Sequence, residues 1–404
     1  MKNTFSISTL GCRANQADSE RLSQLLRAAG LQELPAGEKV DCAVINTCTI
    51  TAEADHKSLK LLRRRQKEAK LVIVTGCGVT ERGGLSVPSG VHVLLPGDGS
   101  DILDILRREG LAVEPLGHLD TRQHRTRALL RVQDGCDHFC SYCIVPYVRG
   151  RIKSFNADDL VCQVQRLEED GYKEIVLTGI HVAKWGHELA EPSDLSYLVR
   201  RFLDSTGEVR FRLSSIEPIA FPRAIIDLMR EFPDRVCPYL HLPIQHASDR
   251  ILKRMRRDYT LAEYDAVVQE FLSVPGACLT TDVMVGFPGE TEEDMDILCG
   301  YLERTPYYHL HVFPYSRRPG TAADTYKDQI PEEIKKERVE RVIALGERLK
   351  ERVLEKFRGT RRPVLAERVL GDTGLVIGTA DNYISVKFPG DASLLGKIVM
   401  AEIS

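Results

Sequence analysis

The chain has 404 residues, of which 43% are hydrophobic and 28% are charged, and its formal net charge is −3. This length predicts two or three domains with ordinary hydrophobic cores. The net charge excludes a protein that binds nucleic acid through an overall polybasic surface. No apolar run approaches the ~20 residues of a membrane-spanning helix, and the first residues lack the apolar core of a signal peptide. We therefore expect a cytoplasmic protein whose 11 cysteines do not form a disulfide framework.

The first part of the chain alternates β-rich runs with helical patterns. The expected strands are 4–11, 41–48, 70–77 and 91–97. Helical periodicity between them, as in "SERLSQLLRAAG", makes this a βαβ series. Such a series predicts an α/β fold with a parallel sheet and helices on both faces. We expect this N-terminal domain to occupy residues 1–120.

A second alternating series follows the basic connector "TRQHRTRALLR". Its expected strands are 128–133, 173–179, 208–215, 239–244, 278–285 and 307–313. Six βα units favour an open, partial TIM-like barrel, because eight units would close a full one. A long charged helix at 331–357 ends this domain, which we expect to span 121–357. The short β-type runs and Gly/Asp turns of 358–404 predict a small C-terminal β-barrel.

Three cysteines each end a predicted strand of the N-terminal domain, namely Cys12, Cys48 and Cys77. The carboxyl ends of parallel strands lie on one edge of a sheet, so we expect these thiols to converge. Gly11 and Gly76 precede two of them and let the backbone turn sharply. The pattern favours a shared metal site, and three buried structural thiols are the alternative.

A second trio lies in "DGCDHFCSYC", where Cys136, Cys140 and Cys143 follow the first barrel strand. Barrel enzymes place their chemistry at this end of the strands. Cysteine thiolates hold iron–sulfur clusters, typically four for a cluster of four irons, so three leave one iron open to a small molecule. Zinc completed by water or by His138 is the alternative. Core packing is expected for the other cysteines, which are Cys42, Cys162, Cys237, Cys278 and Cys299.

The stretch "CDHFCSYC" on a βα-barrel resembles the radical S-adenosylmethionine superfamily. Segments along nearly the whole chain, including "TLGCRANQADSE", "INTCTITAEADHKS", "RLSSIEP" and "TDVMVGFPGETEEDM", resemble its methylthiotransferase family. The tail "GLVIGTADNYISVKF" resembles the TRAM domain with which these proteins grip RNA. The residues after the second cysteine are most similar to the branch that acts on N6-threonylcarbamoyladenosine in tRNA.

This resemblance implies an enzyme with two four-iron, four-sulfur (4Fe–4S) clusters and two S-adenosylmethionine molecules. The barrel trio would hold the cluster that generates a 5′-deoxyadenosyl radical, and Cys12, Cys48 and Cys77 would hold an auxiliary cluster that carries the sulfur. The reaction would convert C2–H of the adenine to C2–SCH₃. The implied partners are tRNA, an electron donor such as flavodoxin or ferredoxin, and an unidentified sulfur donor. Two alternatives stay open: methylthiolation of another substrate such as a ribosomal protein, and a redox-sensing RNA-binding protein.

By the same resemblance, barrel strand ends are expected to bind S-adenosylmethionine. The expected residues are Thr178, Gly179, Ser215, Glu217, Gln245, Asp282 and Gly286. Solvated loop carboxylates are the alternative for Glu217 and Asp282, and a helix-capping turn is the alternative for Gly286. After the fourth barrel strand the family pattern runs Gln-Ser-Gly-Ser-Asp, whereas this chain has "QHASD".

Arginines near the predicted barrel mouth are expected to contact tRNA phosphates, which would give salt-dependent affinity. They are Arg63, Arg64, Arg65, Arg149, Arg151, Arg317 and Arg318. A solvated charged face is the alternative. Tyr383 in the tail is expected either to stack on a base or to fill the core of the small barrel. Asn15 and Asn46, beside the early cysteines, are expected to donate near cluster sulfurs and to fix the cysteine loops, and capping or turn formation is the alternative.

Overall fold

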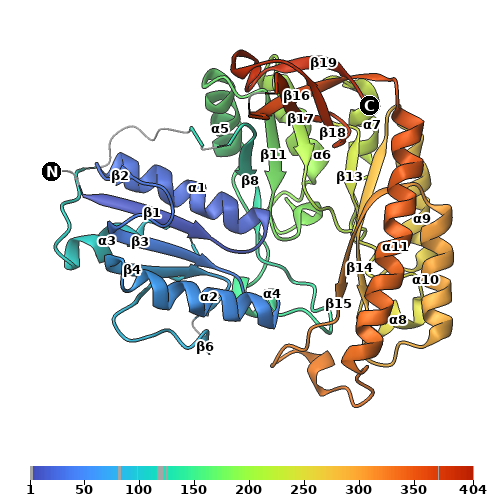
Figure 1. The fold of residues 1–404 in the computed structure, drawn as a ribbon, viewed down its shortest axis with the longest axis horizontal. Coiled ribbons are helices and arrows are strands. Elements are labelled where there is room, and N and C mark those ends of the chain that lie inside the picture. Colours follow the sequence, from blue (N-terminus) through green and yellow to red (C-terminus); the bar gives the residue numbers. More distant parts are fainter. Residues whose placement is uncertain are drawn as a thin grey trace.

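The computed structural model describes residues 3–80, 83–97, 99–115, 122–123, 125–371 and 373–403. Figure 1 shows an N-terminal sheet on the left, a half-barrel in the centre and a small sheet at the top beside the C-terminus. The boundary expected between residues 120 and 121 lies outside the described residues. The α/β class and the order of the three parts agree with the expectation from sequence.

The N-terminal sheet has five parallel strands in the order β2-β1-β3-β4-β7. They are β1 (Thr4–Thr9), β2 (Gln32–Glu33), β3 (Val40–Thr47), β4 (Ala69–Gly76) and β7 (His92–Val93). Helices α1 (Arg13–Ala28) and α3 (Asp101–Arg108) pack on one face of the sheet. Helix α2 (Ala52–Arg65) covers the other face through Leu62. Strands β5 (Val79–Thr80) and β6 (Gly83–Gly84) form a separate hairpin after β4.

One expected strand is much shorter than its apolar run. Of residues 91–97, only His92 and Val93 pair with β4. Leu94 adds one backbone hydrogen bond to Val74. Pro96 has no N–H to donate, which prevents further regular pairing at this edge of the sheet.

The half-barrel has six parallel strands in chain order. They are β8 (Ala128–Arg131), β11 (Glu174–Thr178), β12 (Arg210–Leu213), β13 (Tyr239–His241), β14 (Cys278–Val285) and β15 (Tyr307–Pro314). Parallel bridges Phe211–Val236 and Ser215–His241 join β12 to the β13 side. In the described part of the chain β8 and β15 do not pair, so the barrel stays open. Helix α1 of the N-terminal part packs against β8.

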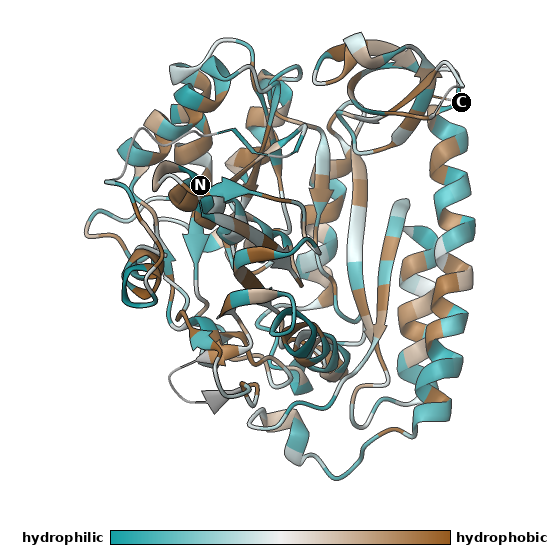
Figure 2. Ribbon diagram, turned by 60° about the vertical axis from the view of Figure 1, so that its left-hand side comes forward, coloured by the Kyte–Doolittle hydropathy of each residue, from teal (hydrophilic) through white to brown (hydrophobic). Residues whose placement is uncertain are grey.

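Helices cover the outside of the half-barrel (Figure 1). They are α5 (Ala157–Glu169), α6 (Leu195–Ser205), α7 (Ala224–Glu231), α8 (Asp249–Arg254), α9 (Leu261–Leu272), α10 (Glu292–Arg304) and α11 (Glu332–Phe357). Short 3₁₀ helices lie at Val182–Lys184, Ala322–Thr325 and Ala392–Leu394. Figure 2 shows apolar and polar residues alternating along α11. Its buried side includes Val342, Leu345 and Leu349, so the charge run of this helix is its solvated face. Among the described residues, none of the helices is apolar and long enough to span a membrane.

The C-terminal part is a curled antiparallel sheet of four strands in the order β18-β17-β16-β19. The strands are β16 (Arg361–Val369), β17 (Leu375–Ala380), β18 (Ser385–Pro389) and β19 (Ile398–Glu402). Its apolar side shares a core with Val353 and Phe357 of α11 and with Cys278 of β14. The expected small β-barrel is therefore a curled sheet that packs on the half-barrel. The boundary expected at 357–358 stays a prediction.

Candidate active site at the mouth of the half-barrel

The early cysteines lie at the ends of three neighbouring strands. Cys12 follows β1 and caps α1, Cys48 follows β3, and Cys77 follows β4. Gly11 has φ +104°, and a Cβ atom at this position would lie 3.1 Å from the Sγ of Cys48. Cys48 and Cys77 are buried and Cys12 is exposed. The parallel sheet thus brings the three thiols to one edge, as its topology requires.

Two asparagines hold the loops of this early trio. Asn15 donates through Nδ2 to the carbonyls of Leu10 and Thr47, at 2.8 Å each. Asn46 donates to the carbonyl of Asn15 at 2.7 Å. Among the described residues, the Nδ2 groups of both asparagines donate to backbone carbonyl and hydroxyl oxygens. They therefore fix the loops and do not donate to sulfur.

The second trio lines a cavity of about 270 Å³ at the barrel mouth. Cys136, Cys140 and Cys143 follow the short strand β9 (Gln133–Asp134) and precede α4 (Val145–Arg149). Ile50 and Thr51, two and three residues after the early Cys48, also line this cavity. The loop of the early trio therefore forms part of the pocket that contains the barrel trio.

The barrel trio has an uneven electrostatic environment. Burial raises the pKa of Cys136 to about 11 and raises that of Cys143 further. Burial would also raise the pKa of Cys140, but a hydrogen bond with His138 and the charge of Arg257 outweigh it and hold the pKa below the usual range. Arg257 lies 3.4 Å from the Sγ of Cys140 and is paired with Glu217. Because a thiolate is the form that ligates metal, Cys140 is the best prepared of the three.

Several polar atoms in this cavity are buried and have no hydrogen-bond partner among the described residues. They are both ring nitrogens of His181, Oε1 of Gln245, Nε of Arg257 and the hydroxyl of Tyr315. Buried polar atoms normally have a hydrogen-bond partner, so several such atoms without one in the same cavity indicate a site for a polar ligand. The carboxylate of Glu217 lies in the same wall. Donors, acceptors and charge are thus available for a ligand with both amino and carboxylate groups.

The structure separates the residues expected to bind S-adenosylmethionine into two groups. Glu217 and Gln245 line the cavity, and Gln245 has a left-handed backbone with φ +60°. Thr178 is buried at the end of β11 and does not line the cavity. At Gly179, a Cβ atom would lie 2.7 Å from the carbonyl of Gln133, so this glycine permits close strand packing.

Three of the expected cofactor residues lie elsewhere. Ser215 is exposed outside the cavity lining. Asp282 is 3.1 Å from Nε2 of His241, so its carboxylate is engaged with a histidine. Gly286 packs against Lys335 of α11 at φ +70°, which agrees with a turn role before α10. None of the three lines the cavity, and their contact with S-adenosylmethionine stays a prediction.

The "QHASD" segment packs into the protein. His246 is fully buried, and its Nδ1 accepts a hydrogen bond from the backbone of Ser248 at 2.9 Å. Its Nε2 lies 3.5 Å from Glu290. Ala247 is also buried. The two unusual residues thus contribute to packing behind Gln245, and neither lines the cavity.

Some cavity residues were not expected from the sequence. His181 follows β11 by three positions, and Tyr315 follows β15 directly. The strand-end rule applied to these two positions would have found them. Arg257 comes from the loop after α8, where no sequence signal marks it.

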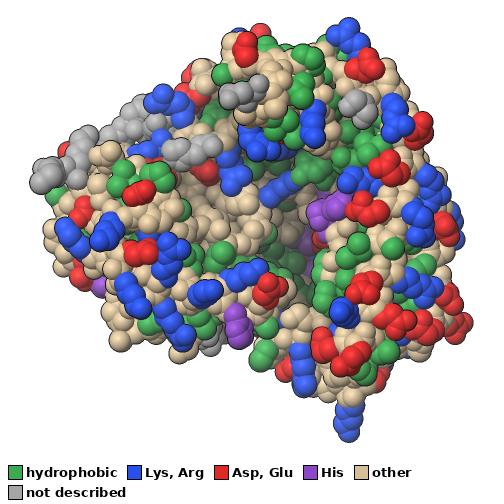
Figure 3. Space-filling view, viewed as in Figure 1, with side chains coloured by type: hydrophobic (Ala, Val, Ile, Leu, Met, Phe, Trp, Pro, Cys, Tyr) green, Lys and Arg blue, Asp and Glu red, His purple; other side chains and the backbone are tan. Residues whose placement is uncertain are grey.

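The arginines expected to contact RNA divide by burial. Arg63, Arg64, Arg151 and Arg317 are exposed. Figure 3 shows Lys and Arg side chains around a hollow between the N-terminal sheet and the half-barrel, with histidines inside it.

Three of these arginines are buried in protein contacts, and their contact with RNA stays a prediction. Arg65 donates to Ser6 at 2.6 Å and pairs with Glu68. Arg318 pairs with Asp55 at 2.7 Å and donates to Thr49. The buried Arg149 contacts the early cysteine site.

The donor set of each trio fits an iron–sulfur cluster better than a single ion. Among the described residues, no three His, Cys, Asp or Glu side chains converge closely enough to hold one metal ion. A single zinc needs its sulfurs about 2.3 Å from one point. A four-iron cluster is larger, and its cysteines bind different irons, so its thiolates stand further apart. Two trios made of cysteine sulfurs alone are suited to this larger group.

Family models match two parts of the chain. The model described as "Radical SAM superfamily" matches residues 130–302, and the model described as "Uncharacterized protein family UPF0004" matches residues 4–87. The first match contains the barrel trio, and the second contains the early trio.

Curated relatives align along almost the full length. The threonylcarbamoyladenosine tRNA methylthiotransferase MtaB of Bacillus subtilis is 34% identical, over 99% of this chain and 93% of that protein. The tRNA-2-methylthio-N(6)-dimethylallyladenosine synthase of Acetivibrio thermocellus is 33% identical, over 100% and 89%. The synthase of the same name from Aquifex aeolicus is 32% identical, over 100% and 96%.

Solved structures share the fold at low sequence identity. The radical S-adenosylmethionine methyltransferase TsrM from Kitasatospora setae has a TM-score of 0.52 at 14% identity, over 80% of this chain and 77% of that chain. The cobalamin-dependent S-adenosylmethionine radical enzyme OxsB has a TM-score of 0.54 at 12% identity, over 87% and 61%. These two likenesses concern the fold alone.

Proposed function

We propose that this chain, which belongs to the radical S-adenosylmethionine methylthiotransferase family, replaces C2–H of N6-threonylcarbamoyladenosine beside the tRNA anticodon by C2–SCH₃. The observation that carries the proposal is the juxtaposition of two cysteine trios. The loop after Cys48 forms part of the cavity that Cys136, Cys140 and Cys143 line. The substrate is suggested by the name of the Bacillus relative, which is 34% identical over nearly the whole chain.

The residues present would hold two groups. Cys136, Cys140 and Cys143 would ligate one 4Fe–4S cluster, and the early trio would ligate a second. When bound, these clusters with two S-adenosylmethionine molecules supply a 5′-deoxyadenosyl radical and a methylated sulfur, chemistry that no amino-acid side chain provides at an unactivated C–H. An electron donor such as flavodoxin or ferredoxin and a sulfur donor complete the proposal.

The chain's own residues would bind and shield S-adenosylmethionine. Glu217 supplies a carboxylate for its amino group, and Gln245 and His181 supply unpaired polar atoms within the same cavity. Met284 and Phe313 form apolar wall, which excludes water from a reactive intermediate. Arg257 contacts both Cys140 and Glu217, so it links the cysteine ligand of the cluster to the carboxylate that would bind S-adenosylmethionine.

Mass spectrometry of tRNA nucleosides tests the substrate. A strain lacking this chain is expected to lose 2-methylthio-N6-threonylcarbamoyladenosine, and a plasmid copy is expected to restore it. Unchanged nucleoside levels in the deletion strain would rule out the tRNA substrate and favour methylthiolation of a protein.

Matched cysteine variants test the division of labour. After anaerobic reconstitution, Cys140→Ala is expected to stop formation of 5′-deoxyadenosine while iron at the early trio remains. Cys162→Ala removes an exposed thiol of α5 and is expected to change neither quantity. Continued 5′-deoxyadenosine formation by Cys140→Ala would contradict the proposed role of the barrel trio, and its absence in the parent chain would favour a redox-sensing RNA-binding protein.

A further inference from the structure

We infer that Arg149 is a positioning residue that joins the two cysteine sites and donates a hydrogen bond to the sulfur of Cys77. The inference rests on the proposed early cluster. It assigns to Arg149 control of that cluster's reduction potential and of its retention, which is a different role from the phosphate contact that its position suggested.

The chain delivers Arg149 from the loop of the barrel trio. Helix α4 starts two residues after Cys143 and ends at Arg149, with Gly150 at φ +76° behind it. The loop is closed at its base, because the backbone N–H of Cys136 donates to the carbonyl of Gly150 at 3.0 Å. At Gly135, a Cβ atom would lie 1.9 Å from the carbonyl of Arg151, so only glycine permits this closure. The barrel cysteines and Arg149 therefore belong to one closed loop.

At its tip, the Arg149 guanidinium enters the early site. Its Nε donates to the Sγ of Cys77 at 3.1 Å. Its Nη2 donates to Oδ1 of Asn15, the residue that holds two of the early loops. Its Nη1 pairs with Asp18 of α1 at 2.9 Å. The side chain is fully buried, so water does not compete for these contacts.

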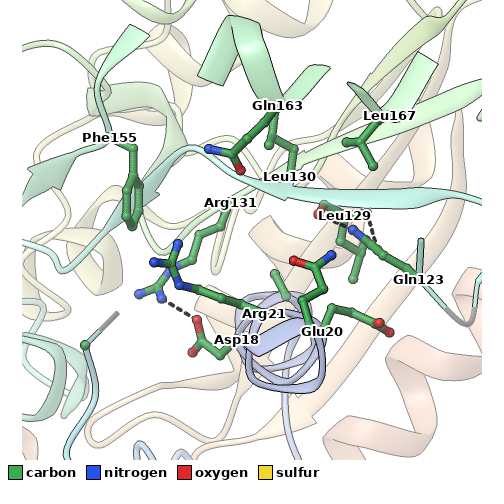
Figure 4. A pocket seen from close by; sticks show the side chains of 13 residues that line it. Asp18, Glu20, Arg21, Gln123, Leu129, Leu130, Arg131, Phe155, Gln163 and Leu167 are labelled. Carbon is green, nitrogen blue, oxygen red and sulfur yellow. Dashed lines mark hydrogen bonds and ion pairs between the residues drawn. The ribbon is translucent and has the colours of Figure 1, made fainter. Parts of the chain in front are cut away.

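Arg149 shares its two carboxylate partners with a second arginine, Arg131. Arg131 pairs with Asp18 and Asp134, the same two carboxylates that face Arg149 at 2.9 and 3.5 Å. Figure 4 shows Asp18 of α1 and Arg131 of β8 bonded to each other beside a small interdomain pocket. These four groups form one buried network of ion pairs. Arg149 acts on Cys77 both through its charge and through the hydrogen bond from Nε.

Such a hydrogen bond has a specific consequence for a cluster. Hydrogen bonds to the sulfurs are among the determinants of iron–sulfur reduction potentials, since they stabilise the more negative reduced form. Groups behind the ligands also govern metal retention, and their loss typically costs about 10- to 100-fold in affinity. A purely structural arginine would change folding but would leave the potential of an assembled cluster where it was.

The test uses the full chain with Cys136, Cys140 and Cys143 replaced by Ala, so that only the early trio can bind iron. In this parent, Arg149→Met is expected to make the reduction potential more negative and to speed iron loss to a chelator by about 10-fold or more. Arg149→Lys keeps the buried charge, but one ammonium cannot replace three directed contacts. It is expected to recover part of the iron retention and part of the reduction potential.

Arg151→Met is the matched control, because Arg151 is an exposed cation two residues away in the same segment. It is expected to leave both quantities unchanged. The inference is overturned if both Arg149 variants keep the parent's potential and rate of iron loss. If Arg149→Met does not fold, the potential of Arg149→Lys decides between the outcomes. A parent that binds no iron would overturn the early cluster itself, and with it the proposed function.

Discussion

His181 shows how burial sets the chemistry of one strand-end residue. Its ring is 3% exposed, lines the barrel cavity and has no partner among the described residues for either nitrogen. Burial lowers its pKa to about 4, although the charge of Glu217 acts in the opposite direction. At pH 7 the ring is therefore neutral and offers a ligand one donor and one acceptor.

His181 predicts a loss of stability in mild acid. Between its unfolded pKa of about 6.5 and its folded pKa of about 4, the unfolded chain binds more protons, so stability falls as the pH decreases. The single-site relation gives about 2 kcal/mol lost between pH 7 and pH 5. His181→Gln is expected to reduce the pH 5 loss by about this amount in urea unfolding of the metal-free chain.

The control for this prediction is His56→Gln, which alters an exposed histidine of α2. It is expected to keep the parent's pH dependence. If His181→Gln and His56→Gln lose the same free energy of unfolding between pH 7 and pH 5, protonation of His181 does not drive the acid effect.

A buried cluster of ion pairs on strands β11 and β12 connects the half-barrel to the C-terminal sheet. Glu174 accepts from Nε of Arg210 and Nε of Arg212, at 2.7 Å each. These arginines also donate to backbone carbonyls of the C-terminal sheet, at Pro363, Ala380 and Asp381. Despite its burial, the charges of Arg212 and Arg210 hold the pKa of Glu174 far below its usual range. One carboxylate thus compensates the cations that hold two elements together.

Glu174→Gln is expected to lower the free energy of unfolding by about 3–5 kcal/mol, because it leaves two buried guanidinium groups without their counter-charge. Urea unfolding monitored by circular dichroism measures the change. Glu208→Gln removes a carboxylate that pairs with Lys173 and is 76% exposed, so it is expected to cost less than about 1 kcal/mol. If both variants lose the same free energy of unfolding, the buried ion-pair cluster does not contribute to stability.

Across the whole molecule, the three parts meet at Tyr383. The hydroxyl of this residue accepts a hydrogen bond from Arg13, next to Cys12, at 2.7 Å. Its ring stacks on Tyr239 of the half-barrel with centroids 4.3 Å apart. Of the two roles expected for Tyr383, the structure therefore shows packing within the protein. This contact ties the C-terminal sheet to the early cysteine site.

The exposed arginines predict that RNA affinity depends on a few positions despite the net charge of −3. Arg63→Gln with Arg64→Gln is expected to weaken tRNA binding and to reduce the slope of log K against log salt by roughly 1–2. Filter binding of unmodified tRNA at several salt concentrations measures both. Lys336→Gln with Arg348→Gln removes two exposed cations of α11 and is expected to leave the slope unchanged. Similar slopes for both double variants would place the RNA elsewhere.

Local patterns were sufficient for the series of strands and for the position of both cysteine trios. Alternation and helical periodicity mark the βα units, and a parallel sheet necessarily collects strand ends at one edge. Cys12, Cys48 and Cys77 could therefore be grouped although up to 65 residues separate them. Glu217 and Gln245 were expected from the family resemblance, and both line the cavity. Neither the resemblance nor the strand-end rule specifies which strand-end residues face the cavity, and Ser215 and Asp282 do not line it.

The fate of the arginines was decided by tertiary contacts. Arg65 finds Ser6 at a distance of 59 residues along the chain, and Arg318 finds Asp55 at a distance of 263. Arg149 reaches Cys77, which follows β4, and Asn15 of α1, both in the N-terminal part of the chain. A guanidinium has the same charge in a phosphate-binding surface and in a buried ion pair. Only tertiary packing, which places distant hydroxyl, carboxylate and sulfur groups beside the arginine, determines which of the two it becomes.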